Sequence, residues 1–153
     1  MKRIEVGDPA PDIQMETHRG DMISLADYKG SNPVVLFFYP KDGTPVCTKE
    51  ACAFRDAHEI FAIADAVIIG VSGDTIERHR SFAESHDLPY VLVSDTDGQV
   101  RKAFGVKRTM GIMPGRVTYV IDREGIVQHV FRAAFAADRH VGEALDSIRK
   151  LKS

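Results

Sequence analysis

The two cysteines of the chain, Cys47 and Cys52, both lie in the segment PKDGTPVCTKEAC, residues 40–52. By residue type alone, inert core thiols are the more common case, because buried cysteine is frequent in folded proteins. The surroundings favour reactivity instead. The segment follows a predicted buried strand directly and opens a predicted helix, with Cys47 in its first turn. In sheets covered by helices, ligands gather beyond the carboxyl ends of the strands, which is where this segment stands.

A helix start has a chemical consequence for a thiol. Unpaired backbone N–H groups and the positive end of the helix dipole stabilise an anion there. A free thiol has a pKa of about 8.5, so full ionisation raises its reactive fraction at neutral pH only about thirtyfold. Fast chemistry also requires groups that hold the substrate and stabilise charge on a leaving oxygen. Thr44 and the N–H groups of Val46 and Cys47 can provide such contacts, and a guanidinium from elsewhere in the chain would complete the site.

Hydrophobic patterning predicts the elements that carry this segment. Apolar runs predict buried strands. The two final runs along the chain are joined by a short loop with Gly125, which predicts a hairpin. The expected strands are Val34–Tyr39, Ala66–Val71, Tyr90–Val93, Val117–Ile121 and Ile126–Phe131. Helical spacing appears at Thr48–Ile63, at Thr75–His86, and after a cap at Asp138, and the N-terminal thirty residues favour a small appended hairpin. This order predicts a three-layer α/β domain: a mixed sheet with helices on both faces.

Length and composition place further limits. The 153 residues fit one domain, 1–153, with 44% apolar residues and a net charge of −2. Nothing in this balance favours a nucleic-acid or membrane partner, and no apolar run is long enough for a membrane span. The first five residues carry two cations with no apolar segment after them, so we expect no signal peptide and a cytoplasmic location. In that compartment a static structural disulfide is not expected.

The spacing Pro-x-x-x-Thr-x-x-Cys, formed by Pro40, Thr44 and Cys47, resembles the signature of the peroxiredoxins, the alkyl hydroperoxide reductase/thiol-specific antioxidant family. Arg116, directly before a predicted strand, matches that family's second-site arginine. A second cysteine five residues after the first resembles the Q-type subfamily, also called bacterioferritin comigratory protein. The residues of 48–56 and 71–95 are similar to that subfamily too, so the resemblance covers nearly the whole chain. It implies a thioredoxin-like fold with an N-terminal extension.

The resemblance also implies a reaction. Cys47 would attack a hydrogen peroxide or organic hydroperoxide and become a sulfenic acid, Cys52 would condense with it to a disulfide, and thioredoxin or a glutaredoxin-like dithiol would reduce that disulfide. Thr44, Arg116 and Pro40 would belong to the catalytic set. Substrate would contact Val46, Thr44 and Arg116, with Glu50 in support, and Val46 stands where the subfamily usually has Gly. No cofactor or metal is implied, and a monomer is expected, with a dimer through the loops around the site as the alternative.

Helix geometry adds an expectation of its own. Residues five apart on a helix are separated by about 7.5 Å along the axis and roughly 140° around it. Their Cα atoms then lie farther apart than the ~7 Å that a disulfide tolerates. A bond between Cys47 and Cys52 therefore requires the first turn or two of the helix to unwind.

Other interpretations stay open for several residues. Cys52 can be an inert core thiol, Arg116 a surface charge, and Glu50 a local ion-pair partner of Arg55. We expect Lys41 and Asp42 to be solvated loop charges. Three histidines are expected to be solvated or capping residues: His58, His79 and His86.

Competing kinds of site have weaker support. A zinc site would need a second pair of ligands, which the sequence does not offer. A thioredoxin-type centre would need the motif C-x-x-C, and in this chain Thr44 stands where the first cysteine of that motif would be. A cysteine protease would need a histidine partner such as His129, for which no local signature exists. A redox-sensing or holdase role remains compatible with the same fold.

Overall fold

The computed structural model describes residues 3–106, 108–109, 113–114, 116–133 and 137–151. Its main sheet has five strands in the order β5-β4-β3-β8-β9. The three strands β3, β4 and β5 run parallel, whereas β8 runs antiparallel to both β3 and β9. The strand bounds are β3 Val34–Phe38, β4 Val67–Ser72, β5 Val91–Ser94, β8 Val117–Ile121 and β9 Val127–Arg132. The predicted mixed sheet is therefore confirmed.

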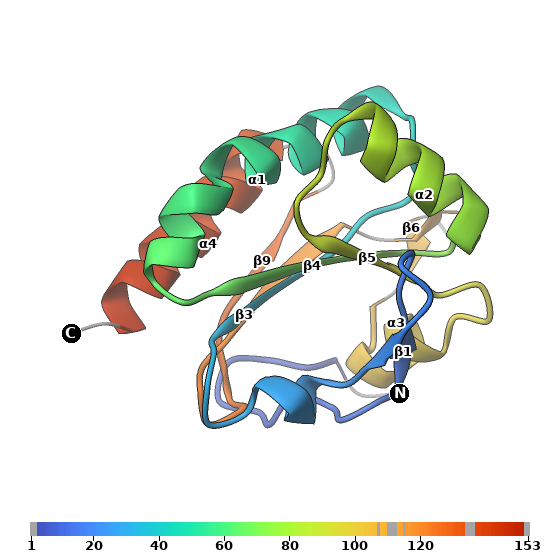
Figure 1. Cartoon of the computed structure of the whole chain (residues 1–153). Helices are drawn as coiled ribbons and strands as arrows, with labels where there is room; N and C mark the ends of the chain where they lie inside the picture. The colour runs from blue at the N-terminus through green and yellow to red at the C-terminus, as the bar shows by residue number, and fades with distance from the viewer. Residues whose placement is uncertain (1–2, 107, 110–112, 115, 134–136, 152–153) are drawn as a thin grey trace.

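Helices cover one face of this sheet, and the N-terminal segment with a short helix covers the other (Figure 1). The first face carries α1 (Pro45–Ile63), α2 (Ile76–Ser85) and α4 (Ala137–Leu151). The second carries β1 (Met15–Glu16), β2 (Met22–Ile23), the 3-10 helix η1 (Leu25–Tyr28) and α3 (Gln99–Phe104). The expected N-terminal hairpin is confirmed by the antiparallel β1–β2 pair, and Thr17 bridges it to Val93 of β5. A further short pair consists of β6 (Arg108–Thr109) and β7 (Met113–Pro114).

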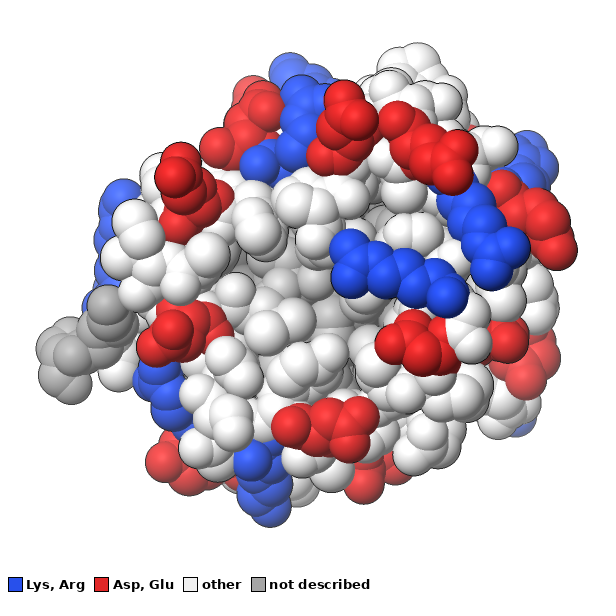
Figure 2. All heavy atoms as spheres, viewed as in Figure 1, with Lys and Arg blue, Asp and Glu red and all other residues white. Residues whose placement is uncertain are grey.

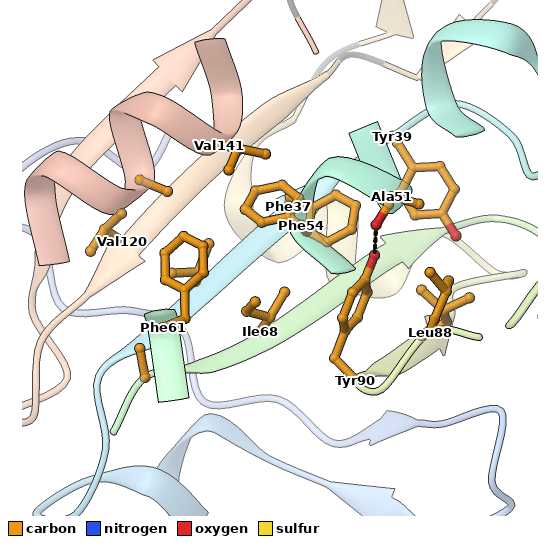
Figure 3. Close-up of a cluster of buried hydrophobic side chains, with 14 of the residues drawn as sticks. Phe37, Tyr39, Ala51, Phe54, Phe61, Ile68, Leu88, Tyr90, Val120 and Val141 are labelled. Carbon is orange, nitrogen blue, oxygen red and sulfur yellow. Dashed lines mark hydrogen bonds between the residues drawn. The ribbon is translucent and has the colours of Figure 1, made fainter. Parts of the chain in front are cut away.

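Strand β3 is buried along its whole length because apolar side chains project from both of its faces. On the helical face, Phe37 stacks on Phe54 of α1 with ring centroids 4.5 Å apart, and Phe61 packs beyond it. Figure 3 shows these rings between the sheet and the helices. Gly70 of β4 lets the Phe37 ring approach, since a Cβ at that position would lie 2.8 Å from the ring. This packing fixes α1 against the centre of the sheet.

The differences from the sequence-based expectations are local. Helix α3 was not predicted, although Gly98 and Gly105 bound it in left-handed conformations and Asp95 accepts the N–H groups of its first turn. Helix α4 begins at Ala137, which puts Asp138 inside the first turn and not at the cap position. No helix in the described ranges has the length and apolarity required to cross a bilayer. Figure 2 shows a face where acidic and basic side chains alternate around an uncharged, hollowed centre.

Candidate active site

Cys47 lies in the first turn of α1, just beyond the carboxyl end of β3, as the sequence predicted. Gly43, at φ +84°, turns the chain in a conformation that favours glycine, and Thr44 and Pro45 then begin the helix. The first helical hydrogen bond runs from the Thr48 N–H to the Thr44 carbonyl at 2.8 Å. The N–H groups of the turn before it have no carbonyl within the helix to bind, so they can donate to an anionic sulfur or a substrate oxygen.

Arg116 reaches Cys47 because of strand register. Phe38, the last residue of β3, pairs with Val117, the first residue of β8, so the residue before β8 lies beside the start of α1. Its Nη2 donates to the Cys47 Sγ at 3.1 Å. Burial by itself lowers the pKa of Arg116, but the negative charges of Glu50 and Cys47 outweigh it and raise that pKa. Arg116 therefore remains a cation that stabilises negative charge on sulfur, and the sequence-based pairing of Arg116 with the thiol is supported by geometry.

Glu50 lies one helical turn after Cys47 and is fully buried. Its Oε1 accepts from the Arg116 Nη1 at 2.5 Å. Burial raises the pKa of Glu50 to about 7, against the opposing effect of the guanidinium. The alternative of an ion pair with Arg55 is wrong: Arg55 pairs with Asp56 at 3.0 Å. Glu50 therefore supports the site through Arg116.

Thr44, Val46 and Pro40 belong to the segment that leads into the first turn of α1, and none of the described hydrogen bonds joins them to the Cys47 sulfur. The Thr44 hydroxyl donates to the Lys41 carbonyl at 3.0 Å, which leaves its oxygen lone pairs for a donor such as a hydroperoxide O–H. Val46 is half-buried in the first turn of α1, and Pro40 is half-buried directly after Tyr39, where the strand ends. The structure therefore places these residues next to Cys47 in sequence and leaves their role in the site as a proposal.

Cys52 is half-buried on the same intact helix, and both cysteines are free thiols. The structure does not bring the two sulfurs together, since α1 is continuous from Pro45 to Ile63. The Tyr90 hydroxyl donates to the Ala51 carbonyl at 2.7 Å and holds this part of α1 against β5 (Figure 3). The wound helix thus keeps the second thiol away from the first.

Asp42 and His79 correct two expectations, because both are buried and neither is solvated. The Asp42 carboxylate accepts from the Tyr39 hydroxyl at 2.5 Å and lies 2.6 Å from the His79 Nδ1. The backbone N–H of Asp42 donates to the Asp74 carboxylate at 2.7 Å. Only Lys41 of the loop charges is exposed, as expected. Sequence reasoning missed this network because Asp42 lies in a loop, which carries no periodic signal of burial, and because His79 of α2 is polar by type.

The same three side chains, Asp42, Asp74 and His79, lie close enough to hold a metal ion. Their polar atoms are already engaged with protein groups. The second ring nitrogen of His79 lies 3.0 Å from the Val93 carbonyl, and Asp74 accepts from Ser72 at 2.7 Å. This donor set fits a structural network that ties the loop before Cys47 to β4, β5 and α2.

His140 of α4 is a second residue that sequence reasoning missed. It is fully buried, with its Nδ1 3.5 Å from the Glu50 Oε2. Its spacing of four from Ala144, on the apolar stripe of the last helix, was the available signal. The arrangement as a whole is a buried thiol at a helix start, with a guanidinium on the sulfur and a carboxyl on the guanidinium. Such a site can stabilise a thiolate and the charge that develops when it attacks an oxygen–oxygen bond.

Comparison with known proteins agrees with this chemistry. The model of the AhpC/TSA family matches residues 6–130. The chain is 46% identical to peroxiredoxin Bcp of Bacillus subtilis, with 97% of each chain covered. It is 43% identical to the chloroplastic peroxiredoxin Q of Triticum aestivum over 97% of this chain and 69% of that protein.

Solved structures give the same result. The peroxidoxin BcpB of Mycobacterium tuberculosis superimposes with a TM-score of 0.91 at 38% identity, covering 99% of this chain and all of that one. The bacterioferritin comigratory protein of Xanthomonas campestris superimposes with a TM-score of 0.86 at 28% identity, covering 98% of each. The thioredoxin-like fold expected from the resemblance is confirmed. With the buried thiol, its guanidinium and these relatives in agreement, the chain belongs to the AhpC/TSA family, in its peroxiredoxin Q/Bcp branch, and is a thiol-dependent peroxidase that uses a peroxide and a thiol reductant.

Proposed function

We propose that Cys47 is the thiol that attacks the peroxide, with Arg116 and the start of α1 stabilising it. The observation that carries this assignment is the 3.1 Å contact between the Arg116 Nη2 and the Cys47 Sγ in a buried site. The thiolate attacks one peroxide oxygen, the O–O bond breaks, and the other oxygen leaves as an alkoxide or hydroxide that takes up a proton. The free N–H groups of the first turn and Arg116 stabilise the negative charge that develops on the leaving oxygen. Thr44 orients the peroxide by accepting its O–H.

Cys52 is the resolving thiol in this proposal. The sulfenic acid on Cys47 condenses with Cys52 to form an intramolecular disulfide and water. For residues five apart on a helix, the Cα atoms are about 8.6 Å apart, so α1 must unwind before the two sulfurs meet. The half-buried position of Cys52 supports this role, because its side chain is already partly exposed in the wound helix.

The remaining assignments rest on membership of the peroxiredoxin Q/Bcp branch. Hydrogen peroxide and organic hydroperoxides are the proposed substrates, and the bacterioferritin comigratory protein of Xanthomonas campestris is described as having alkyl peroxide reduction activity. Val46 narrows the mouth of the site and Pro40 ends the strand before it. Thioredoxin or a glutaredoxin-like dithiol is the proposed reductant. We propose that residues 1–153 act as one domain in the cytoplasm, as a monomer, with a dimer through the loops around the site as the alternative.

Mass spectrometry after one equivalent of peroxide tests these roles. Wild type is expected to lose two hydrogen atoms in a Cys47–Cys52 disulfide. Cys52→Ser is expected to stop at a Cys47 sulfenic acid that a dimedone-type reagent traps, and Cys47→Ser is expected to consume no peroxide. Undiminished peroxide consumption by Cys47→Ser would overturn the assignment of the nucleophile. A trapped sulfenic acid in wild type, with no intramolecular disulfide, would overturn the role of Cys52 alone.

A further inference from the structure

Glu50 and Cys47 share one cation. The Arg116 guanidinium donates through Nη1 to the Glu50 Oε1 at 2.5 Å and through Nη2 to the Cys47 Sγ at 3.1 Å. Both partners can be anions, and Glu50 is fully buried. A buried site of this kind is most stable when its net charge is close to zero. One guanidinium therefore balances one anion, either the thiolate or the carboxylate.

The second oxygen of Glu50 identifies which partner is neutral. Oε2 is buried and has no hydrogen-bond partner among the described residues. The Nδ1 of His140 lies 3.5 Å from it. An ionised carboxylate would leave Oε2 without a donor, which is costly in a buried site. A protonated carboxyl, in contrast, has an O–H that can point at a nearby acceptor.

His140 presents such an acceptor. Its Nε2 lies 2.8 Å from the Ala133 carbonyl, which can only accept, so Nε2 carries the ring proton. Burial lowers the pKa of His140 to about 4, which keeps the ring neutral. Its Nδ1 then carries one lone pair, which lies 2.7 Å from the Thr118 hydroxyl and 3.5 Å from the Glu50 Oε2 and can accept from either O–H.

Among the titratable groups around Glu50, only Arg116 favours the ionised carboxylate, and burial outweighs it. In the part of the chain that the structure describes, the cation in contact is Arg116 before β8, and Cys47 on the same helix competes for it. His140 on α4 is neutral. Tyr90, directly before β5, also stays neutral, because burial raises the pKa of its phenol well above the ordinary value. Nothing among these described groups offers Oε2 a proton donor.

We propose, on the basis of the proposed role of Cys47, that Glu50 holds a proton while Cys47 is a thiolate and releases it when Cys47 becomes a sulfenic acid. His140 is the positioning residue that keeps the carboxyl protonated in the reduced enzyme. The S–O bond forms and the O–O bond breaks, so sulfur is oxidised by two electrons and the leaving oxygen is reduced to an alkoxide. The sulfenic acid no longer balances Arg116, so the Glu50 carboxyl ionises to do so. Glu50 releases one proton and the alkoxide takes up one proton, so the step exchanges no net proton with the solvent.

Proton counting during one oxidation step tests this directly. In a Cys52→Ser background, a weakly buffered solution with an indicator dye reports protons exchanged per peroxide consumed, at a pH where the ultraviolet absorbance confirms the thiolate. We expect uptake close to zero when Glu50 is present and close to one proton when Glu50→Gln is added. The matched variant Glu143→Gln, on α4 and paired with His129 at 3.0 Å, should behave like the Cys52→Ser parent.

Two further measurements make the result independent of how a variant folds. Infrared difference spectra of the Cys52→Ser protein should lose a protonated carboxyl band on sulfenic acid formation. His140→Asn replaces the acceptor with an amide that can donate to Oε2, so its proton uptake should rise towards one. Uptake close to one in the Cys52→Ser parent, or no loss of the carboxyl band, would overturn the proton-holding role, and unchanged uptake in His140→Asn would overturn the positioning role. If no sulfenic acid forms at all, the proposed function fails instead.

Discussion

The hydrogen bond from Tyr90 to Ala51 exists only while α1 is wound. The Tyr90 hydroxyl donates to the Ala51 carbonyl at 2.7 Å, and that carbonyl belongs to the peptide bond that joins Ala51 to Cys52. Cys52 cannot turn towards Cys47 without moving this peptide. In Tyr90→Phe the ring and its edge contact with Phe37, at 5.8 Å between centroids, remain possible, and only the hydroxyl is lost.

The magnitude follows from the value of one buried hydrogen bond, about 1 kcal/mol. Because the bond is absent in the unwound helix, its whole contribution shifts the equilibrium between wound and unwound α1. A change of about 1 kcal/mol alters an equilibrium constant roughly fivefold. If disulfide formation waits on this opening, Tyr90→Phe should form the Cys47–Cys52 disulfide roughly five times faster. Its melting temperature should fall by about 2–4 °C.

The assay is a single turnover: reduced protein is mixed with one equivalent of peroxide, quenched with acid, alkylated and analysed by mass spectrometry. Faster resolution should also lower the fraction of sulfinic acid formed at a given peroxide concentration. Tyr119→Phe is the matched control, since its hydroxyl is near the Phe104 carbonyl, 3.5 Å away on the opposite face of the sheet. Equal resolution rates in the two variants, or a slower rate in Tyr90→Phe, would refute the argument that opening of α1 limits the step.

Three further outcomes are expected. Amide hydrogen exchange across residues 47–54 should be faster in the oxidised than in the reduced protein, and equal protection in both states would contradict unwinding. Asp42→Asn removes the buried carboxylate that contacts the Tyr39 hydroxyl and the His79 Nδ1, and it should lower the free energy of unfolding by about 2 kcal/mol in urea titration, whereas the exposed Asp56→Asn should change it little. Burial raises the pKa of Glu50 from 4.5 to about 7, so the folded state binds the extra proton and stability falls as pH rises through that range. Urea titrations of Glu50→Gln and wild type should therefore diverge, with the variant gaining about 3 kcal/mol between those two pH values, and a constant difference would contradict a protonated Glu50.

The sequence predicted the parts of this fold that repeat along the chain. Apolar runs predicted the five main strands within one or two residues, because a strand buried on both faces leaves a continuous signal. The helical spacing of Thr48–Ile63 predicted α1 apart from its first three residues, and Cys47 was expected in its first turn. The six-residue helix α3 was missed because so few turns give no reliable apolar stripe.

The polar interior was where sequence reasoning failed. Asp42 and His140 look like surface residues by type, and only the tertiary structure shows that each satisfies a buried partner. The contact of Arg116 with Cys47 depends on strand register, which sequence spacing does not specify, and the match to a family motif supplied it in advance. Long-range polar pairs have no local pattern to read, so their prediction requires the fold first.

The site has to meet two opposing demands on one helix. Reaction with peroxide needs the first turn of α1 wound, because its free N–H groups and the Arg116 contact exist only in that conformation. Resolution needs the same turns undone. The contacts divide accordingly: the buried network around Asp42 fixes the loop before Thr44, whereas the Tyr90 hydroxyl and the Arg116 contact hold the turns that must open. Once the thiolate becomes a neutral sulfenic acid, the Arg116 contact weakens, so oxidation itself lowers the cost of unwinding.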